Sequence, residues 1–270
     1  EAVSLASRIS DINAKGYTDA GEDHAGKNTV QLALEGGFHG RTYRPARISH
    51  ATQSAYQKQL ASFRRIDDLL FIPPNDTESL RAVFERARSQ ELFIEAFFLE
   101  PVMGEGRPGL TIDRSFYDLA RTLTSEHGSL LIVDSIQAGL RAHGCLSIID
   151  YPGFEDCDPP DLETYSKALN AGQYPLSVLA CNERAARLYQ TGVYGNTMTT
   201  NRRALEVGCA VLDAIDEDLR RNIRERGVQL VDQLKELSGE FPGVIGDISG
   251  TGLLVCAELD SRRYSVTGEG

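Results

Sequence analysis

A short apolar run that ends in an acid constrains this chain more than any other feature. Leu130 to Val133 are consecutive apolar residues, Asp134 follows them, and Gly128 and Gly139 bound the segment. Such a short, continuously apolar run is typical of a strand buried on both faces, as in a parallel sheet. Ligand sites in open α/β sheets lie at the carboxyl ends of such strands. We therefore expect Asp134 at the ligand-binding edge of a parallel sheet.

A lone lysine, Lys167, ends a second short strand-like segment that begins after Pro159-Pro160-Asp161. An acid and a lysine at neighbouring strand ends match the two needs of pyridoxal phosphate. A lysine forms a Schiff base with its aldehyde, and an aspartate keeps its pyridine nitrogen protonated. The amide of Gln137 could reach the phenolic oxygen. However, an aspartate at a strand end is often only a cap, and a lone lysine is usually a solvated charge, so this spacing alone does not decide.

Six segments along nearly the whole chain, two of which contain Asp134 and Lys167, resemble the motifs of a known family. In order, they are Gly-Gly-Phe-His-Gly-Arg-Thr at 36–42, Glu-Pro-Val-Met-Gly-Glu-Gly at 100–106, Asp-Ser-Ile-Gln-Ala-Gly at 134–139, Ser-Lys-Ala-Leu at 166–169, Gly-Asn-Thr at 195–197 and Gly-Asp-Ile-Ser-Gly-Thr-Gly-Leu at 246–253. Together they resemble the class III pyridoxal phosphate-dependent aminotransferases, the group of the ornithine, acetylornithine and 4-aminobutyrate aminotransferases. The resemblance implies a fold-type I α/β architecture with a mostly parallel sheet covered by helices.

The resemblance also implies roles for particular residues of this chain. Lys167 would carry the cofactor, and Asp134 would pair with its ring nitrogen. Gln137 would bind the phenolic oxygen, Phe38 would lie flat on the ring, and Thr197 would bind the phosphate of the neighbouring subunit's cofactor in a homodimer.

Three other candidates have less specific roles. Glu105 would be a gate residue that pairs with a distal arginine. Glu100 would lie near the cofactor, either touching it or supporting residues that do. His39 is placed among the cofactor-binding residues, and a loop histidine bonded to backbone is favoured over a proton-transfer group. No metal site is expected.

Two departures from the family pattern bear on substrate preference. The family usually has a glutamate directly after the ring aspartate, where this chain has Ser135. The segment 140–144, Leu-Arg-Ala-His-Gly, also differs from the usual arginine-threonine-glycine. Neither departure removes the lysine, the aspartate or the glutamine, so the chemistry should survive.

The ends of the sequence suggest an internal piece of a longer chain. Residues 1–3 look like the middle of the family's phosphate-binding turn, whose cradle would lie before Glu1, and the late substrate arginine would lie after Gly270. Alternatively, flexible parts were left out. We expect a large cofactor-binding domain at 1–205 and, at 206–270, a linking helix with the start of a small C-terminal α+β domain.

Composition is that of an ordinary soluble enzyme. The chain has 270 residues, 41% of them hydrophobic, which suffices for a sizeable core. A net charge of −11 argues against a nucleic-acid partner, and the sequence lacks an apolar stretch long enough for a membrane span. The five scattered cysteines indicate reduced thiols in the cytoplasm or an organellar matrix.

Hydrophobic patterns and turn signals predict alternating strands and helices. Helices are expected at 3–14, at 75–88 with Asn75 as the cap and Glu78 supporting it, at 113–127, and from 201 to about 237 with a bend. Strands are expected at 28–34, 69–72, 93–100, 130–134 and 176–181, and β-type alternation at 244–259.

The resemblance thus implies a transaminase that moves an amino group from an amine or amino acid to a 2-oxo acid, with 2-oxoglutarate or pyruvate as the acceptor by analogy with the family. An aminomutase, racemase or decarboxylase would keep the same cofactor residues. A non-catalytic dimeric relative is a further alternative, although folding alone does not require Lys167, Asp134 and Gln137 together.

Overall fold

A six-stranded sheet forms the centre of the computed structural model, which describes residues 1–64, 66–197 and 199–260. The strand order is β2-β1-β3-β4-β5-β6. All neighbouring strands are parallel except β6, which is antiparallel to β5. The strands are β1 (Asn28–Leu34), β2 (Leu69–Ile72), β3 (Leu92–Leu99), β4 (Leu130–Asp134), β5 (Leu162–Tyr165) and β6 (Val178–Cys181). The predicted mostly parallel sheet is confirmed.

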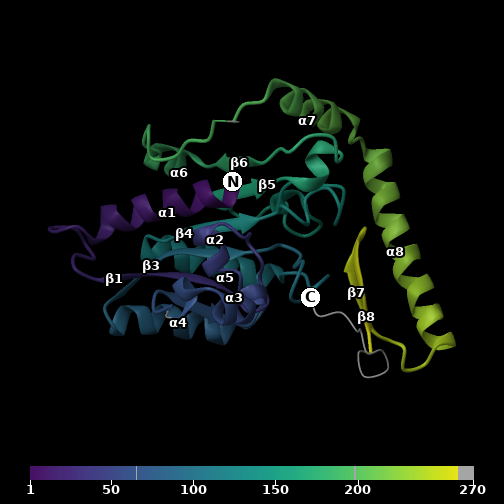
Figure 1. The fold of residues 1–270 in the computed structure, drawn as a ribbon, viewed down its shortest axis with the longest axis horizontal. Helices are drawn as coiled ribbons and strands as arrows, with labels where there is room; N and C mark the ends of the chain where they lie inside the picture. Colours follow the sequence, from purple (N-terminus) through teal and green to yellow (C-terminus); the bar gives the residue numbers. More distant parts are fainter. Residues whose placement is uncertain (65, 198, 261–270) are drawn as a thin grey trace.

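Helices cover both faces of this sheet (Figure 1). On one face, α4 (Thr77–Ser89) and α5 (Arg114–His127) pack with β1, β3 and β4 into the larger apolar cluster. On the other face, α1 (Ala2–Thr18) and α6 (Glu183–Leu188) contribute to a second cluster. Short helices α2 (Tyr43–Arg47) and α3 (Gln53–Gln59) follow β1. Because both faces are covered, all five residues of β4 are buried, as its unbroken apolar run predicts.

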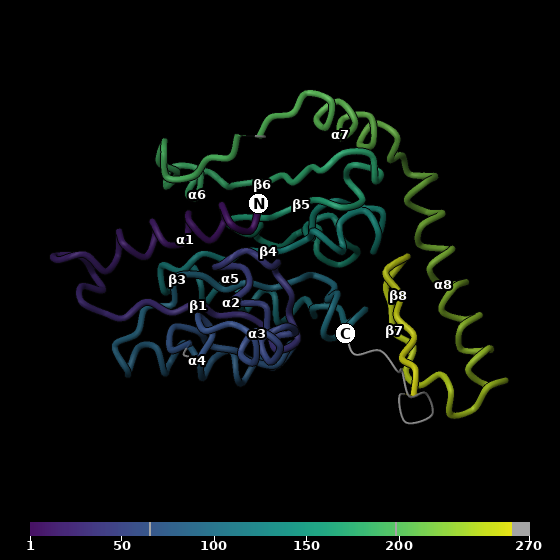
Figure 2. The backbone as a smooth tube through the Cα atoms, in the orientation of Figure 1, coloured from purple at the N-terminus to yellow at the C-terminus, as the bar shows by residue number. Residues whose placement is uncertain are grey.

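The C-terminal part of the chain leaves the sheet through two helices and returns as a hairpin. It consists of α7 (Arg202–Ala214), α8 (Glu217–Glu240), and the antiparallel strands β7 (Ile245–Thr251) and β8 (Leu254–Leu259). Figures 1 and 2 show α8 and the hairpin beside the body of the sheet. The hairpin turn touches the loop after β4: Leu253 N donates to Arg141 O (2.9 Å), and a Cβ on Gly252 would lie 1.7 Å from Ala142 O. Only glycine allows this approach.

Most predicted elements are confirmed, with three corrections at their ends. The helix α4 is capped by Asp76, which accepts from Ser79 N, and not by Asn75, whose side chain instead bonds Thr111 O and Asp113 N. The long helical region from residue 201 is two helices rather than one bent helix, because Asp216 caps the second one. Lys167 does not end a strand; it opens a short 3-10 helix, Lys167–Asn170, after β5. None of the helices in the described residues is long and apolar enough to cross a membrane.

A buried histidine joins α5 to the amino-terminal end of β3. His127 is 4% exposed, stacks on Phe93 with ring centroids 5.3 Å apart, and accepts a hydrogen bond from Ile94 N on Nε2 (3.3 Å). Burial, with smaller contributions from His24, Lys27 and other cations, lowers the pKa of His127 to about 4. An imidazole in this place is therefore neutral at pH 7, and its protonation opposes folding.

We predict that His127 makes the fold sensitive to acid. Between about pH 6.5 and pH 4 the unfolded chain binds a proton that folded His127 refuses, so stability is retained above pH 6.5 and falls as the pH drops through this window, by about 2 kcal/mol. His127→Phe should lower stability at pH 7, because Ile94 N loses its acceptor, yet flatten this pH dependence. Urea unfolding from pH 4 to pH 7.5 measures the slope. An unchanged slope in the variant would show that other groups cause the acid sensitivity.

Candidate active site

The predicted site residues come together at the carboxyl edge of the sheet. Glu100 directly follows β3, Asp134 ends β4, and Lys167 lies two residues beyond β5. The loop after β1 brings in His39, whose backbone N–H donates to Ser49 Oγ (2.8 Å). Four separate segments of the sheet thus supply one site, at the edge where parallel sheets place ligands.

Asp134 is held from three sides. Its Oδ1 accepts from Thr164 Oγ1 (3.0 Å) and Ile136 N (3.2 Å), and its Oδ2 lies 3.0 Å from His39 Nδ1. The side chain is 5% exposed. A carboxylate with this many donors keeps one rotamer, so its direction is set before any ligand binds. The bond from Thr164 was missed from the sequence; the pairing of Asp134 with Thr164 in the β4–β5 register explains it.

The His39 side chain does not bond to backbone, so that interpretation is wrong; it bonds the Asp134 carboxylate. The ring is fully buried, and its Nε2 is buried without a hydrogen-bond partner among the described residues. Burial by itself lowers the pKa of His39, but the hydrogen bond and charge of Asp134, with a smaller effect of Glu100, outweigh burial and raise it. The sequence offered no signal for this contact, because residues 39 and 134 are distant in the chain.

Glu100 supports the loop after β1 from beneath. It is 2% exposed, its Oε1 accepts from Phe38 N (2.8 Å), and its Oε2 accepts from Gly104 N (3.1 Å). Burial raises the pKa of Glu100 to about 7, against the opposing positive charge of His39 and with a further rise from Asp134. Of the two roles considered for Glu100, these contacts favour support of neighbouring residues.

Gln137 and Glu105 meet at the exposed mouth of the site. Gln137 Nε2 donates to Glu105 Oε1 (3.2 Å). The segment 101–106 comes close enough that a Cβ on Gly104 would lie 2.5 Å from Gln137 Nε2. Glycine at 104 therefore keeps room for the Gln137 amide, which orients the amide toward the mouth.

Lys167 lies in a strained turn. Its φ is +48°, and that of Ala171, which ends the same 3-10 turn, is +50°. Residues other than glycine rarely adopt this backbone conformation, and such strained residues are concentrated at functional sites. Ser166 Oγ contacts Leu176 O (2.5 Å) and ties the turn to the segment before β6.

The surroundings of Lys167 make its amine easier to deprotonate than that of an exposed lysine. Burial is the main cause that lowers the pKa of Lys167, and the positive charge of Arg141 lowers it further. The carboxyl groups of Glu105, Asp134 and Glu100 act in the opposite direction without outweighing burial. A neutral amine is the form that attacks a carbonyl. Arg141 was not singled out from the sequence, although it lies in the segment that departs from the family pattern.

A cavity of about 710 Å³ opens beside Lys167. It is lined from one side by residues 166–178 and from the other by the segment before α7, including Asn196 and Thr199. Thr197, which lies between Asn196 and Thr199 in the sequence, is exposed. Phe38 is half-buried on the opposite loop, where the Arg41 guanidinium lies 5.4 Å from the centre of its ring.

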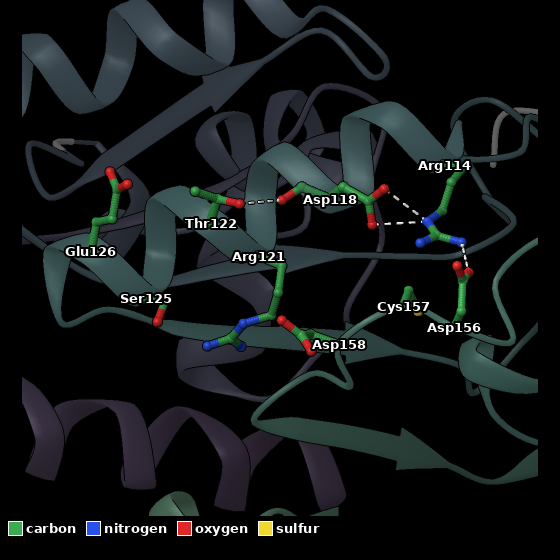
Figure 3. Close-up of a pocket in the computed structure, with 9 residues that line it drawn as sticks. All are labelled: Arg114, Asp118, Arg121, Thr122, Ser125, Glu126, Asp156, Cys157 and Asp158. Atoms are coloured by element: carbon green, nitrogen blue, oxygen red, sulfur yellow. Dashed lines mark hydrogen bonds and ion pairs between the residues drawn. The ribbon is translucent and has the colours of Figure 1, made fainter.

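A second pocket, of about 450 Å³, lies on α5 away from this site. Figure 3 shows Arg114 between Asp118 and Asp156, its partners at 2.8 and 2.5 Å. The predicted site residues do not line it. The other arginine of this pocket, Arg121, is paired with Asp161 (2.7 Å). Because both arginines are already paired with carboxylates of the same chain, the pocket is best explained as ion pairs that fasten neighbouring segments, residues 153–158 among them, to α5.

The residues at the sheet edge fit the cofactor that the sequence predicts. Asp134 presents a fixed anion, Lys167 a partly buried amine of lowered pKa, and Gln137 an amide at the mouth. The chemistry of this donor set suits a cationic ring nitrogen, an aldehyde and a phenolic oxygen.

Comparison with known proteins gives concordant matches. The family model described as "Aminotransferase class-III" matches residues 12–267. An acetylornithine aminotransferase of Thermosynechococcus vestitus is 33% identical over 235 residues, covering 86% of this chain and 54% of the relative. The ornithine aminotransferase 2 of Staphylococcus aureus is 33% identical over 239 residues, covering 86% and 55%. The chain thus spans about half the length of these relatives.

Solved structures agree with these matches. The ornithine aminotransferase of Toxoplasma gondii superposes with a TM-score of 0.76 at 27% identity, over 97% of this chain and 58% of that one. A second structure of that protein records partial occupancy of PLP at its active site.

We predict that Asp134 controls the ionisation of His39. In Asp134→Asn the raising effect is lost while burial remains, so the pKa of His39 should fall from above 6.5 to below it. Nitrogen-detected NMR titration of the imidazoles measures this change. The matched control is Glu105→Gln, which removes an exposed carboxyl that does not bond His39 and should leave its titration unchanged. Equal shifts in both variants would mean that the Asp134 contact does not set the ionisation.

Proposed function

This chain belongs to the class III aminotransferases, and on that premise we propose that the full protein moves an amino group from an amine or amino acid donor to a 2-oxo acid, using pyridoxal phosphate. The observation that carries the proposal is the placement of Asp134 at the end of β4 and of Lys167 two residues beyond the end of the paired strand β5, at one edge of the sheet. An acid and an amine so placed meet the two requirements of that cofactor.

When bound, pyridoxal phosphate supplies an aldehyde and an electron-accepting ring that stabilises negative charge on the substrate carbon. Asp134 would hold a proton on the ring nitrogen, and His39 and Thr164 fix the direction of that carboxylate. Phe38 would lie against the ring, and Gln137 would bind its phenolic oxygen. Glu100 keeps the Phe38 loop in place through the Phe38 N–H.

Lys167 would have two roles in this proposal. Its Nζ, whose pKa burial lowers, would hold the aldehyde of the bound cofactor. The same Nζ is the group placed to carry a proton to and from the substrate carbon. Glu105 would be the gate residue and would pair with a distal arginine.

The named relatives support a choice of donor. Their names, acetylornithine aminotransferase and ornithine aminotransferase 2, favour an amine of the ornithine type as the amino donor of the full protein. An aminomutase, racemase or decarboxylase would use the same residues, but the matched relatives named here are aminotransferases and favour transamination.

We further propose a homodimer with shared active sites, with residues 1–205 as the cofactor-binding domain and 206–270 as the start of the small domain. Two exposed apolar residues, Val178 and Leu205, line the cavity beside Lys167, so a partner that covers this side would both bury them and complete the cavity. Thr197 would then reach the partner's phosphate group. The five free cysteines support a reducing compartment, the cytoplasm or an organellar matrix.

The lysine assignment predicts the product of chemical trapping. Borohydride reduction of the full-length protein loaded with pyridoxal phosphate, followed by peptide mapping, should place the pyridoxyl group on Lys167. Lys167→Ala should lose turnover while retaining some cofactor through other contacts. Recovery of the label on Lys58 or Lys235 instead would refute the assignment.

The shared-site proposal predicts complementation between a variant with weakened cofactor binding and an inactive one. Thr197→Ala should weaken cofactor binding by about tenfold, since a hydrogen bond to a charged group contributes about 1.5–3 kcal/mol. In a mixed dimer of Thr197→Ala and Lys167→Ala subunits, one site carries both defects and the other neither, so activity should partly return.

Mixed dimers can be isolated with two different affinity tags, and each homodimer of the variants serves as the control. If the mixed dimers form but regain no activity, Thr197 serves its own subunit and the sites are not shared.

A further inference from the structure

Glu163 is a buried carboxylate that the chemistry above leaves without a role. It lies in β5, is 3% exposed, and aligns with Val133 of β4. Its oxygens accept from three donors: Ser135 Oγ (2.5 Å) and Ile148 N (3.0 Å) on Oε1, and Ser147 Oγ (2.6 Å) on Oε2. A buried carboxylate is costly unless it is satisfied in this way, so the arrangement calls for an explanation.

The three donors come from both ends of one loop. Ser135 is the first residue after β4, whereas Ser147 and Ile148 lie where the chain enters the next 3-10 turn. Between them the loop carries Gln137 and Arg141, the latter contacted by the C-terminal hairpin. Glu163 therefore closes the loop 135–148 with a single side chain.

Successive side chains of β5 point to opposite faces of the sheet. The closure of the loop by Glu163 is therefore connected to Asp134 through the next residue, Thr164. Leu130, Ile132 and Leu162 pack into the cluster on the α1 face, and Leu131 and Val133 pack into the cluster on the α5 face. Thr164 accordingly bonds Asp134 on the first face, and Glu163 bonds Ser135 on the second. In addition, Thr164 O accepts from Ser135 N (3.0 Å).

We propose that Glu163 is a positioning residue for the cofactor site: by holding both ends of the loop 135–148, it fixes the direction in which Asp134 and Gln137 meet the cofactor. This inference rests on the proposed function for its cofactor, but the loop closure itself does not. In this chain the carboxylate at the junction after β4 is supplied by the neighbouring strand β5.

The chain offers a matched control in Glu95. This residue is also 3% exposed, lies in β3 on the other side of β4 from β5, and is bonded by Ser10 Oγ (2.9 Å) and by Arg44. Its bonds reach α1 and α2, not the loop 135–148. A purely structural loss should therefore appear alike in Glu95→Gln and Glu163→Gln, whereas a loss of positioning should appear only in the second.

The test measures amide hydrogen exchange of residues 135–148 in the cofactor-free, full-length protein, and the dissociation constant of pyridoxal phosphate by absorbance. In Glu163→Gln we expect loop exchange to rise about tenfold or more and cofactor binding to weaken about tenfold. In Glu95→Gln both should stay close to wild type even where thermal stability drops. Ser147→Ala, a smaller change, should reproduce the loop effect in weaker form if Glu163→Gln does not fold.

The double variant Ser135→Glu with Glu163→Ser, which exchanges the residues at the two positions, tests whether cofactor binding can be rescued. It returns a carboxylate to the junction from the other strand, and it should recover cofactor binding relative to Glu163→Ser alone. The inference is overturned if loop exchange is the same in Glu163→Gln, Glu95→Gln and wild type, or if only stability changes. A wild-type protein that binds no pyridoxal phosphate would refute the proposed function, and the exchange measurement would still decide the loop closure.

Discussion

The parallel pairing of β4 with β5 is the constraint on which the site depends. In this register Asp134 lies opposite Thr164, and the chain then needs only two residues beyond β5 to reach Lys167. Backbone hydrogen bonds fix the register along the strands, so the distance between acid and amine is a property of the sheet and not of flexible loops. The loops that follow β1 and β3 add their residues to a site in which the sheet has already fixed the positions of Asp134 and Lys167.

Beside these two strands the protein buries three ionisable side chains close together. Asp134, His39 and Glu100 are all nearly inaccessible to water and lie within reach of one another. Two carboxyls and one imidazole cannot all be ionised cheaply in such a place, and the pKa of about 7 for Glu100 expresses that conflict. The backbone N–H groups of Phe38 and Gly104 offset part of the cost. A cationic ligand near Asp134 would offset more of it, in accordance with a site built to receive one.

The sequence predicted the features that depend on residues close together in the chain, and it did not predict the contacts between residues far apart in the chain. The strands 28–34, 69–72 and 130–134 have the predicted bounds, and for β4 the reason is plain, because its apolar run is unbroken and all five of its residues are buried. The placement of Asp134 at a strand end followed from the same pattern. The cap of α4 was misplaced by one residue, because Asn75 and Asp76 are both good caps and only the contact of Asn75 with α5 separates them. The bonds from Asp134 to His39 and from Glu163 to Ser147 could not be predicted, since they join residues distant in the chain through packing.

The backbone at Lys167 has a consequence for how this protein can change. A left-handed conformation at a lysine costs free energy that glycine would not incur, roughly 1 kcal/mol. Replacement by glycine would thus relax the turn while abolishing any chemistry that needs an amine. Inactive descendants of this chain would then be more stable than the active parent, and only selection on activity would keep the lysine in place. Screening for thermostability alone would drive this position away from function.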